Sequence, residues 1–420
     1  MDKKTIGSWL VHQTGKLQNV NNQSSFENTY FAGKAGILLS AISADSQATI
    51  DQAKLEALAK ASNINTKLEL PNLLTTLKNR ELIDIGANGI EVLGVTTAAT
   101  LKHTADIFEA LSPSSSEVAA IELSEQCSLQ PQDKTRIKDE LSDNFSLSDS
   151  EVSQLLSDSE TIGFVDIEKL DRKFSLYFNG NLFRREDTKK IHLILSTLST
   201  SDQQKVNELN DTLSRKACIS TIDAEKILGA DLFKKLSSIG IYDINVVSNT
   251  QEDVGYITKP SAFAKYSNSM VEDAFDLAKA FVSSLTYGMT RSSYPRGKIR
   301  MIEALLKTLI EGQPVGPVPA IVDDYKVLEL KHVVKVYHGD KSGRRGYLMK
   351  LLKKEVGELA LEAIRKGDVS EQSLKALPSA AITRFQGPEF NREKKRREQL
   401  GANPKATNDM LVVLRTGGGF

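Results

Sequence analysis

The sequence predicts a mainly helical α+β chain made of tandem units with small β-hairpins, followed by a basic α/β C-terminal region. Apolar residues recur at helical spacing through much of the chain. Short strand-like runs flank turns rich in Gly and Asn, and a pattern of helix, strand, turn and strand returns about every 70 to 90 residues. The chain has 420 residues, of which 26% are charged, so we expect a globular protein with several cores.

Residues 1–24 are polar and rich in Asn and Gln, and we expect them to form a loose or docking N-terminal arm. The first unit, residues 25–112, begins with a predicted helix from Phe26 to about Ser43. A second helix follows over 50–61, where apolar residues lie near the helical period. A third helix starts at Pro71, because proline is favoured in the first turn of a helix.

A hairpin is predicted after the third helix, with strands at 82–85 and 89–95. The turn Gly86-Ala87-Asn88-Gly89 suits a hairpin because Gly and Asn accept positive φ. Three helices followed by a hairpin resemble the winged-helix superfamily, a variant of the helix-turn-helix, over about residues 25–110. The resemblance implies a third helix that enters the DNA major groove and a hairpin that contacts the DNA backbone.

The same pattern returns twice, which predicts a second unit at 113–190 and a third at 191–265. In the second unit, the helix that contains Leu155 and Leu156 precedes strands at 163–167 and 174–178. In the third unit, the helix around Leu232, Phe233 and Leu236 precedes strands at 241–247 and 254–258.

Residues 266–318 are predicted to be a helical region and connector, with helices at 270–287 and 299–311 and a stretch rich in Pro and Gly after them. Residues 319–420 are predicted to be a basic winged-helix-like region and tail. Its expected elements are a β-rich run at 325–337, a strand at 347–353, a helix at 355–366 and a strand at 410–414; the run NREKKRREQ is interpreted as a solvated helix face or tail.

Charge is distributed unevenly, although the formal net charge is +0. Residues 1–180 contain 16 basic and 25 acidic side chains, residues 181–290 contain 13 and 14, and residues 291–420 contain 25 and 15. Because electrostatic attraction acts over a Debye length of about 8 to 10 Å, the basic last third indicates an anionic partner.

Two basic clusters in the last third are candidate nucleic-acid contacts. The glycine-rich GDKSGRRG lies at the tip of a predicted hairpin, and TRSSYPRGKIR surrounds a tyrosine at a helix start. Glycines permit close approach to a phosphate, which guanidinium groups bind bidentately. The candidate contacts are Arg291, Arg296, Lys298, Arg300, Lys341, Arg344, Arg345 and Lys350, with Lys234 and Lys235 on the third helix of the third unit.

These features together predict a nucleic-acid-binding protein without enzymatic activity, which acts as a regulator or as the DNA-engaging subunit of a larger complex. Double-stranded DNA is the expected partner, and the acidic N-terminal units are expected to bind a protein partner or to mediate self-association. An alternative is a protein-interaction scaffold that binds no nucleic acid. A lesser alternative is an Mg²⁺-dependent nuclease, because Asp324, Glu329 and Lys331 resemble the D…ExK core of restriction-type nucleases if they lie on a strand.

Other motifs are missing from the sequence. It lacks GxxxxGK[ST], GxSxG and HExxH, and Cys127 and Cys218 are too far apart in sequence to indicate a zinc site, so no cofactor, metal or catalytic residue is predicted. No apolar run approaches the roughly 20 residues that span a bilayer, and no apolar signal core follows Met1. We therefore expect a cytoplasmic protein without membrane association.

Overall fold

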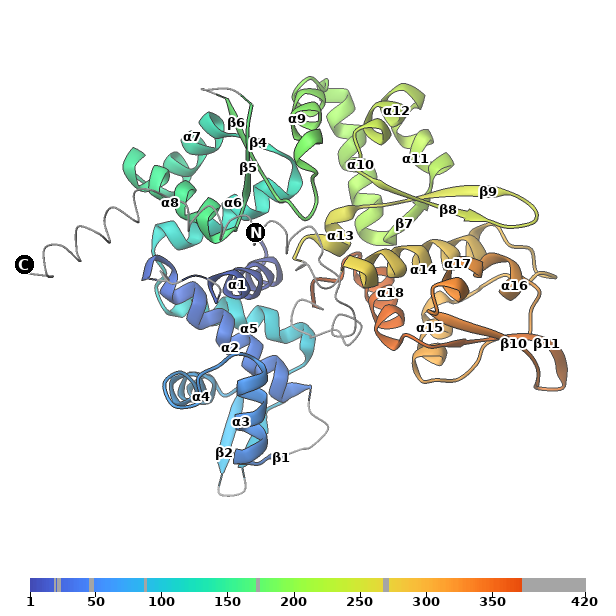
Figure 1. Cartoon of the computed structure of the whole chain (residues 1–420), viewed down its shortest axis with the longest axis horizontal. Helices are drawn as coiled ribbons and strands as arrows, with labels where there is room; N and C mark the ends of the chain where they lie inside the picture. The colour runs from blue at the N-terminus through green and yellow to red at the C-terminus, as the bar shows by residue number, and fades with distance from the viewer. Residues whose placement is uncertain are drawn as a thin grey trace, which may run out of the picture.

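The computed structural model describes residues 1–18, 20, 24–44, 49–86, 89–170, 174–266 and 272–371. Helices make up most of this part of the chain, and its strands form small antiparallel sheets (Figure 1). The mainly helical α+β class predicted from the sequence is confirmed. None of the helices in these ranges is both long enough and apolar enough to cross a membrane.

The first segment, residues 3–110, contains the three helices and the hairpin that the sequence predicts. Its strands form a sheet in the order β1-β3-β2. Asp51 begins the second of the predicted helices, since its side chain accepts a hydrogen bond from the backbone N–H of Lys54. The elements are α1 (Lys3–Leu17), η1 (Ser24–Phe26), α2 (Glu27–Ser43), β1 (Thr49–Ile50), α3 (Gln52–Ala61), α4 (Leu70–Asn79), β2 (Ile83–Gly86), β3 (Gly89–Val92) and α5 (Thr97–Ala110).

The second segment, residues 115–196, has a sheet in the order β4-β6-β5, and the third segment, residues 200–264, has one in the order β7-β9-β8. The second contains α6 (Ser115–Leu129), β4 (Gln132–Asp133), α7 (Lys134–Phe145), α8 (Asp149–Ile162), β5 (Asp166–Lys169), β6 (Ser175–Phe178), η2 (Arg185–Asp187) and α9 (Thr188–Ser196). The third contains α10 (Thr200–Lys216), β7 (Cys218–Ser220), α11 (Thr221–Leu228), α12 (Ala230–Ser238), β8 (Asp243–Ser248), β9 (Asp253–Thr258) and α13 (Pro260–Ala264).

The fourth segment, residues 272–366, ends in the longest hairpin of the described ranges and a final helix. A single bridge between Val315 and Met349 takes the place of a first strand. The elements are α14 (Glu272–Thr290), α15 (Ile302–Ile310), α16 (Ala320–Asp324), α17 (Lys326–Leu330), β10 (Val334–Lys341), β11 (Arg344–Leu351) and α18 (Lys354–Lys366).

One order of elements is therefore shared by all four segments: a helix, a strand, two helices and a hairpin. In each of the first three, the short first strand pairs with the last strand of the hairpin, as β1 does with β3. The bridge from Val315 to Met349 reaches the last hairpin strand of the fourth segment in the same way. The fourth segment differs because α15 is inserted between its first helix and this bridge.

The apolar core is divided along the same lines. Separate buried clusters centre on the first, second and third segments, and the largest joins the fourth segment to β7, β8 and β9 of the third. The hairpin of the third segment also packs along α14, where Lys279 Nζ lies 2.8 Å from Asp243 Oδ2. The third and fourth segments are thus packed as a pair.

Residues 1–24 were predicted to be a loose or docking arm; the loose alternative is wrong for α1, which is docked against the rest of the protein. Trp9 is fully buried, and its indole Nε1 donates a hydrogen bond of 2.7 Å to Glu125 on α6. Gly7 lets α1 approach α5, because a Cβ there would lie 1.9 Å from the carbonyl oxygen of Leu101. Because residues 1–24 are largely polar, the sequence did not indicate a helix that is packed on nearly all sides.

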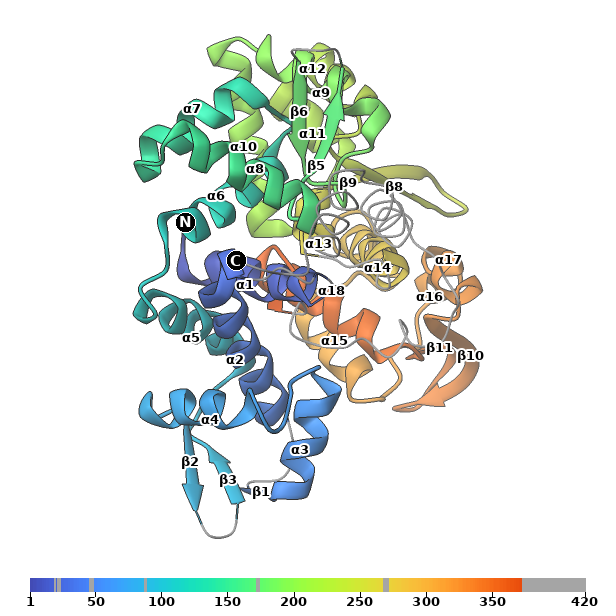
Figure 2. The same ribbon diagram turned by 60° about the vertical axis from the view of Figure 1, so that its left-hand side comes forward.

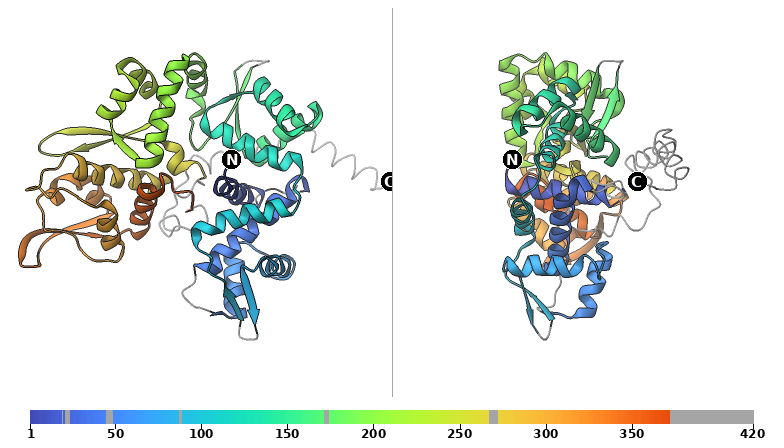
Figure 3. Two further views of the ribbon diagram at one scale, coloured as in Figure 1. Left: turned by 180° about the vertical axis from the view of Figure 1, so that it is seen from behind. Right: turned by 90° about the vertical axis from the view of Figure 1, so that its left-hand side faces the viewer.

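The four segments curve so that the beginning of the chain meets its last described residues. Figure 1 shows the segments following one another around α1, and the same arrangement is seen from behind in Figure 3. Lys4 Nζ lies 3.1 Å from Asp368 Oδ1, just after α18, and Lys265 Nζ lies 2.6 Å from Glu125 Oε2. In Figure 2 the hairpins β2–β3 and β10–β11 project at separate places on the periphery.

One predicted element of the last third has a different secondary structure. Residues 326–330 form the short helix α17, although the sequence predicted a β-rich run over 325–337. Ile321, Tyr325 and Leu328 are buried at spacings of four and three residues, which is the helical period, so the alternation of Val327 and Glu329 was misleading. The predicted strand at 410–414 and the run NREKKRREQ lie outside the described residues.

Candidate functional site

A groove of about 370 Å³ lies in the fourth segment, between the loop after α14, the stretch 315–321 and the β10–β11 hairpin. Lys298 and Arg300 line it from the first predicted basic cluster, and Lys341 and Arg344 line it from the second. No aspartate or glutamate is among the described residues of its wall. The fold thus joins two clusters that are about 40 residues apart in sequence into one positively charged surface.

Backbone hydrogen bonds bring the two clusters together. The N–H of Ala320 donates to the carbonyl oxygen of Arg296 over 3.0 Å, and Val315 and Met349 exchange two hydrogen bonds of 2.9 and 3.0 Å. The stretch 315–321 is therefore bonded both to the loop after α14 and to β11. Gly297 has a φ of +109°, and a Cβ there would lie 2.5 Å from Cβ of Val318, so this close approach requires glycine.

An exposed tyrosine lies beside the groove between two cations. The ring of Tyr294 is 67% exposed, with Lys298 Nζ 5.8 Å and Arg300 Cζ 5.4 Å from its centroid. These cation–π contacts favour positions of both side chains near the ring. Cations can bind phosphate oxygens while an aromatic ring stacks on an unpaired base or a sugar, and the cluster offers both kinds of contact.

Lys341 and Arg344 face each other at the tip of the hairpin. Lys341 Nζ donates a hydrogen bond to the carbonyl oxygen of Pro314, so part of its capacity is used within the protein. Neither Arg344 nor Arg300 forms an ion pair with any residue in the described ranges. The same holds for Lys298, so these two guanidinium groups and the Lys298 ammonium are the cations of the groove that are free to bind an external anion.

Arg296, also predicted as a contact, is held inside the protein. Its Nη2 lies 2.8 Å from Asp324 Oδ1, and its Nη1 donates to Gln251 Oε1 over 2.9 Å. Asn249 Nδ2 donates to the same Asp324 oxygen over 3.0 Å. Burial raises the pKa of Asp324 and Arg296 opposes that rise. Since Asn249 and Gln251 lie at the tip of the third segment's hairpin, Arg296 joins two segments and is not available to a phosphate.

The other predicted contacts lie outside the groove. Arg345 and Lys350 are exposed on β11, opposite Asp340 and Lys335 respectively. Arg291 is exposed just after α14 and lowers the pKa of Asp223 slightly, behind the larger effects of Ser220 and Lys226. Lys234 and Lys235 are exposed on α12 of the third segment. The structure thus unites four of the ten predicted contacts in one groove.

Asp324, Glu329 and Lys331 do not form the geometry that the nuclease interpretation requires. Glu329 lies on the helix α17 and Lys331 follows it, so the strand that this interpretation required is absent from the described residues. Asp324 is bonded to Arg296 and Asn249. No group of three or more His, Cys, Asp or Glu side chains that could hold a metal ion is found in the described part of the chain. Both cysteines are buried, and burial raises the pKa of Cys218 to about 12.

Two features could not be found from the sequence. The clamp formed by Asn249, Gln251 and Arg296 depends on tertiary packing, and in the sequence Asn249 and Gln251 lie only between the predicted strands at 241–247 and 254–258. A cavity between the second and third segments is lined by amide side chains from several elements that share no motif. No protein-family model matches this sequence, and no curated protein matches it at a significant level.

Proposed function

We propose that the four segments are winged-helix-like units and that the chain is a non-enzymatic protein that binds the backbone of double-stranded DNA through the groove of the fourth segment. The observation that carries the proposal is the groove itself, where Lys298, Arg300, Lys341 and Arg344 meet without a described acidic neighbour in the wall. Phosphate contacts supply most of the affinity of nucleic-acid binding that is independent of sequence.

The repeated order of elements supports the winged-helix part of the proposal. In that superfamily the hairpin contacts the DNA backbone, and the groove includes the tip of the β10–β11 hairpin. The third helix, which would read bases, is α17 in the fourth segment and has only five residues. Of its exposed side chains, Val327 and Leu330 cannot form hydrogen bonds to base edges, and Lys326 is paired with Asp323 at 3.8 Å. We therefore infer binding with little sequence preference.

The remaining segments are less suited to DNA. The hairpin of the third segment is held by Arg296 and Asp324 of the fourth, and α8 of the second segment has Asp149 and Glu151 in its first turn. The first segment belongs to the acidic part of the chain. Acidic surfaces repel a polyanion, so we assign these segments to protein partners or self-association.

Fluorescence anisotropy with labelled duplex DNA, single-stranded DNA and RNA at 50 and 200 mM salt would test the proposal. We expect salt-dependent binding of duplexes of unrelated sequence with similar affinity, and loss of that binding in Arg344→Glu. Absence of binding to all three nucleic acids at the lower salt concentration would contradict the proposal and favour a protein-interaction scaffold. Equal binding by Arg344→Glu would contradict the assignment to the groove.

A further inference from the structure

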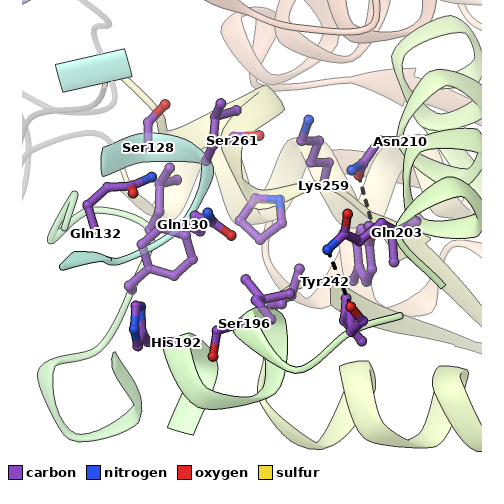
Figure 4. A pocket seen from close by; sticks show the side chains of 18 of the residues that line it. Ser128, Gln130, Gln132, His192, Ser196, Gln203, Asn210, Tyr242, Lys259 and Ser261 are labelled. Atoms are coloured by element: carbon purple, nitrogen blue, oxygen red, sulfur yellow. Dashed lines mark hydrogen bonds between the residues drawn. The ribbon is translucent and has the colours of Figure 1, made fainter. Parts of the chain in front are cut away.

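A second cavity, of about 560 Å³, lies between the second and third segments and shares no lining residue with the basic groove. Its wall comes from the end of α6, from α9 and α10, and from the residues that begin α13 (Figure 4). Cavities of roughly 300 to 1,000 Å³ hold small-molecule ligands in proteins. The space is therefore adequate for a molecule of the size of a nucleoside monophosphate.

The described lining of this cavity has basic side chains and no acidic ones. Arg136, His192 and Lys259 line it, and no carboxylate occurs among the described residues of the lining. The part of the chain before residue 181 contains 25 acidic and 16 basic side chains, and residues 181–290, which supply most of the wall, contain 14 and 13. An acid-free lining in such surroundings favours an anionic ligand.

Lys259 is the cation best placed to bind an anion. Its ammonium makes no hydrogen bond or ion pair with the described residues, although the side chain is half-buried. Burial lowers the pKa of Lys259, and the nearby Lys265 lowers it further, while Glu125 and Asp211 act in the opposite direction. Glu125 is paired with Lys265, and Asp211 forms no ion pair in the described ranges. Lys259 also borders a neighbouring cavity that is lined by Asp2, Glu125 and Asp368, but within the acid-free cavity an incoming anion would be its first partner of opposite charge.

The amide side chains supply both donors and acceptors. Tyr242 donates its hydroxyl to Asn210 Oδ1 over 3.1 Å, which leaves the Asn210 amide nitrogen as a donor. Gln203 Nε2 donates to the carbonyl oxygen of Leu198 over 3.3 Å, which leaves its own oxygen as an acceptor. Figure 4 shows Lys259 and Asn210 on one side of the cavity and His192 on the other, with Gln203 near Lys259. A ligand with a hydrogen-bonding body could use both sides.

We propose that this cavity binds a small organic anion whose phosphate or carboxylate oxygens contact Lys259 and whose polar body contacts the amides of Gln203 and Asn210. The inference goes beyond the proposed DNA binding and does not rest on it. Because the wall comes from two segments, the ligand would contact both at once.

The test uses the full chain and the acetylation rate of individual lysines, followed by mass spectrometry at pH 8. AMP, adenosine, inorganic phosphate and glutarate are the probes, and the exposed Lys216 of the same region is the internal reference. We expect a saturating anion to slow acetylation of Lys259 about tenfold or more, because an ion pair keeps the amine protonated and covered. The rate at Lys216 should not change.

Protection of Lys259 by AMP and inorganic phosphate would identify a phosphate ligand. Protection of Lys259 by glutarate alone would identify a carboxylate ligand. Either result supports the proposal. If none of the three anions protects Lys259, or if adenosine protects it as well as AMP does, the proposal is wrong. Calorimetry supplies a second check: Lys259→Gln should weaken binding of the protecting anion at least tenfold, and unchanged binding would overturn the role of Lys259. Duplex DNA binding by this variant should equal that of the wild type, which separates this inference from the proposed function.

Discussion

Removal of the two uncommitted guanidinium groups of the groove should change the salt dependence of DNA binding by a calculable amount. Each phosphate neutralised on duplex DNA contributes about −0.9 to the slope of log K against log [salt]. Four groove cations, Lys298, Arg300, Lys341 and Arg344, therefore give a slope near −3.6, and the double variant Arg300→Gln with Arg344→Gln gives one near −1.8. Between 50 and 200 mM salt, the wild type should lose affinity about 150-fold and the variant about 12-fold.

Fluorescence anisotropy titrations with one duplex at five salt concentrations would measure both slopes. A matched control is Arg345→Gln with Lys350→Gln, because these exposed residues lie on the same hairpin but outside the groove and remove the same charge. We expect a smaller change of slope in the control than in the groove variant. Equal slopes in the two variants would refute the idea that the groove, as opposed to the hairpin as a whole, holds the backbone.

Three further predictions concern stability. Trp9→Ala should lower the free energy of unfolding by about 3 to 5 kcal/mol, because it removes a fully buried indole. Urea unfolding followed by circular dichroism would measure this loss. A loss below about 1 kcal/mol would mean that α1 contributes little to stability. Arg296→Gln should lower the free energy of unfolding by about 3 kcal/mol in the same measurement, because it leaves the buried Asp324 without its cation. An unchanged free energy of unfolding would contradict the clamp between the third and fourth segments. Lys259→Gln should raise the melting temperature at pH 7. Burial lowers the pKa of Lys259 in the folded protein below the usual 10.5, so the charged side chain destabilises the wild type, in full, at every pH below that folded pKa. This advantage should shrink as pH rises through the folded pKa toward 10.5; thermal melts from pH 7 to 10 check the trend, and a difference that grows with pH would refute it.

Local elements of the repeated segments could be predicted from the sequence because they depend on short-range chemistry. The hairpin at β2–β3 was predicted from its turn residues, and those at β5–β6 and β8–β9 from the return of the same pattern of helix and apolar runs. The helices were predicted mainly from periodicity. The very short strands β1, β4 and β7 were not expected. Two or three residues carry too little pattern, and these strands exist only because they pair with the last strand of each hairpin.

The basic groove was also predictable in part, because its charged residues cluster locally in the sequence. Charge density near Arg300 and Arg344 is visible in the sequence, and the groove unites them. Arg296 instead contacts the buried Asp324 of α16 and Gln251 of the third segment's hairpin. The relative positions of these elements cannot be predicted from local sequence patterns. The sequence left open whether α1 is loose or docked, because its polar residues are buried by contacts with α5 and α6, which lie about 100 residues away.

The contact between Lys4 and Asp368 bears on how the chain unfolds. In a linear repeat array each unit touches only its neighbours, so stability is nearly a sum of local terms and the array can fray from either end. Here Lys4 of α1 forms an ion pair with Asp368, which follows α18. Glu125 accepts a hydrogen bond from Trp9 and forms an ion pair with Lys265. Loss of one terminal unit therefore removes contacts from the other, and we expect the array to behave as a closed ring with one cooperative transition and no separately fraying ends.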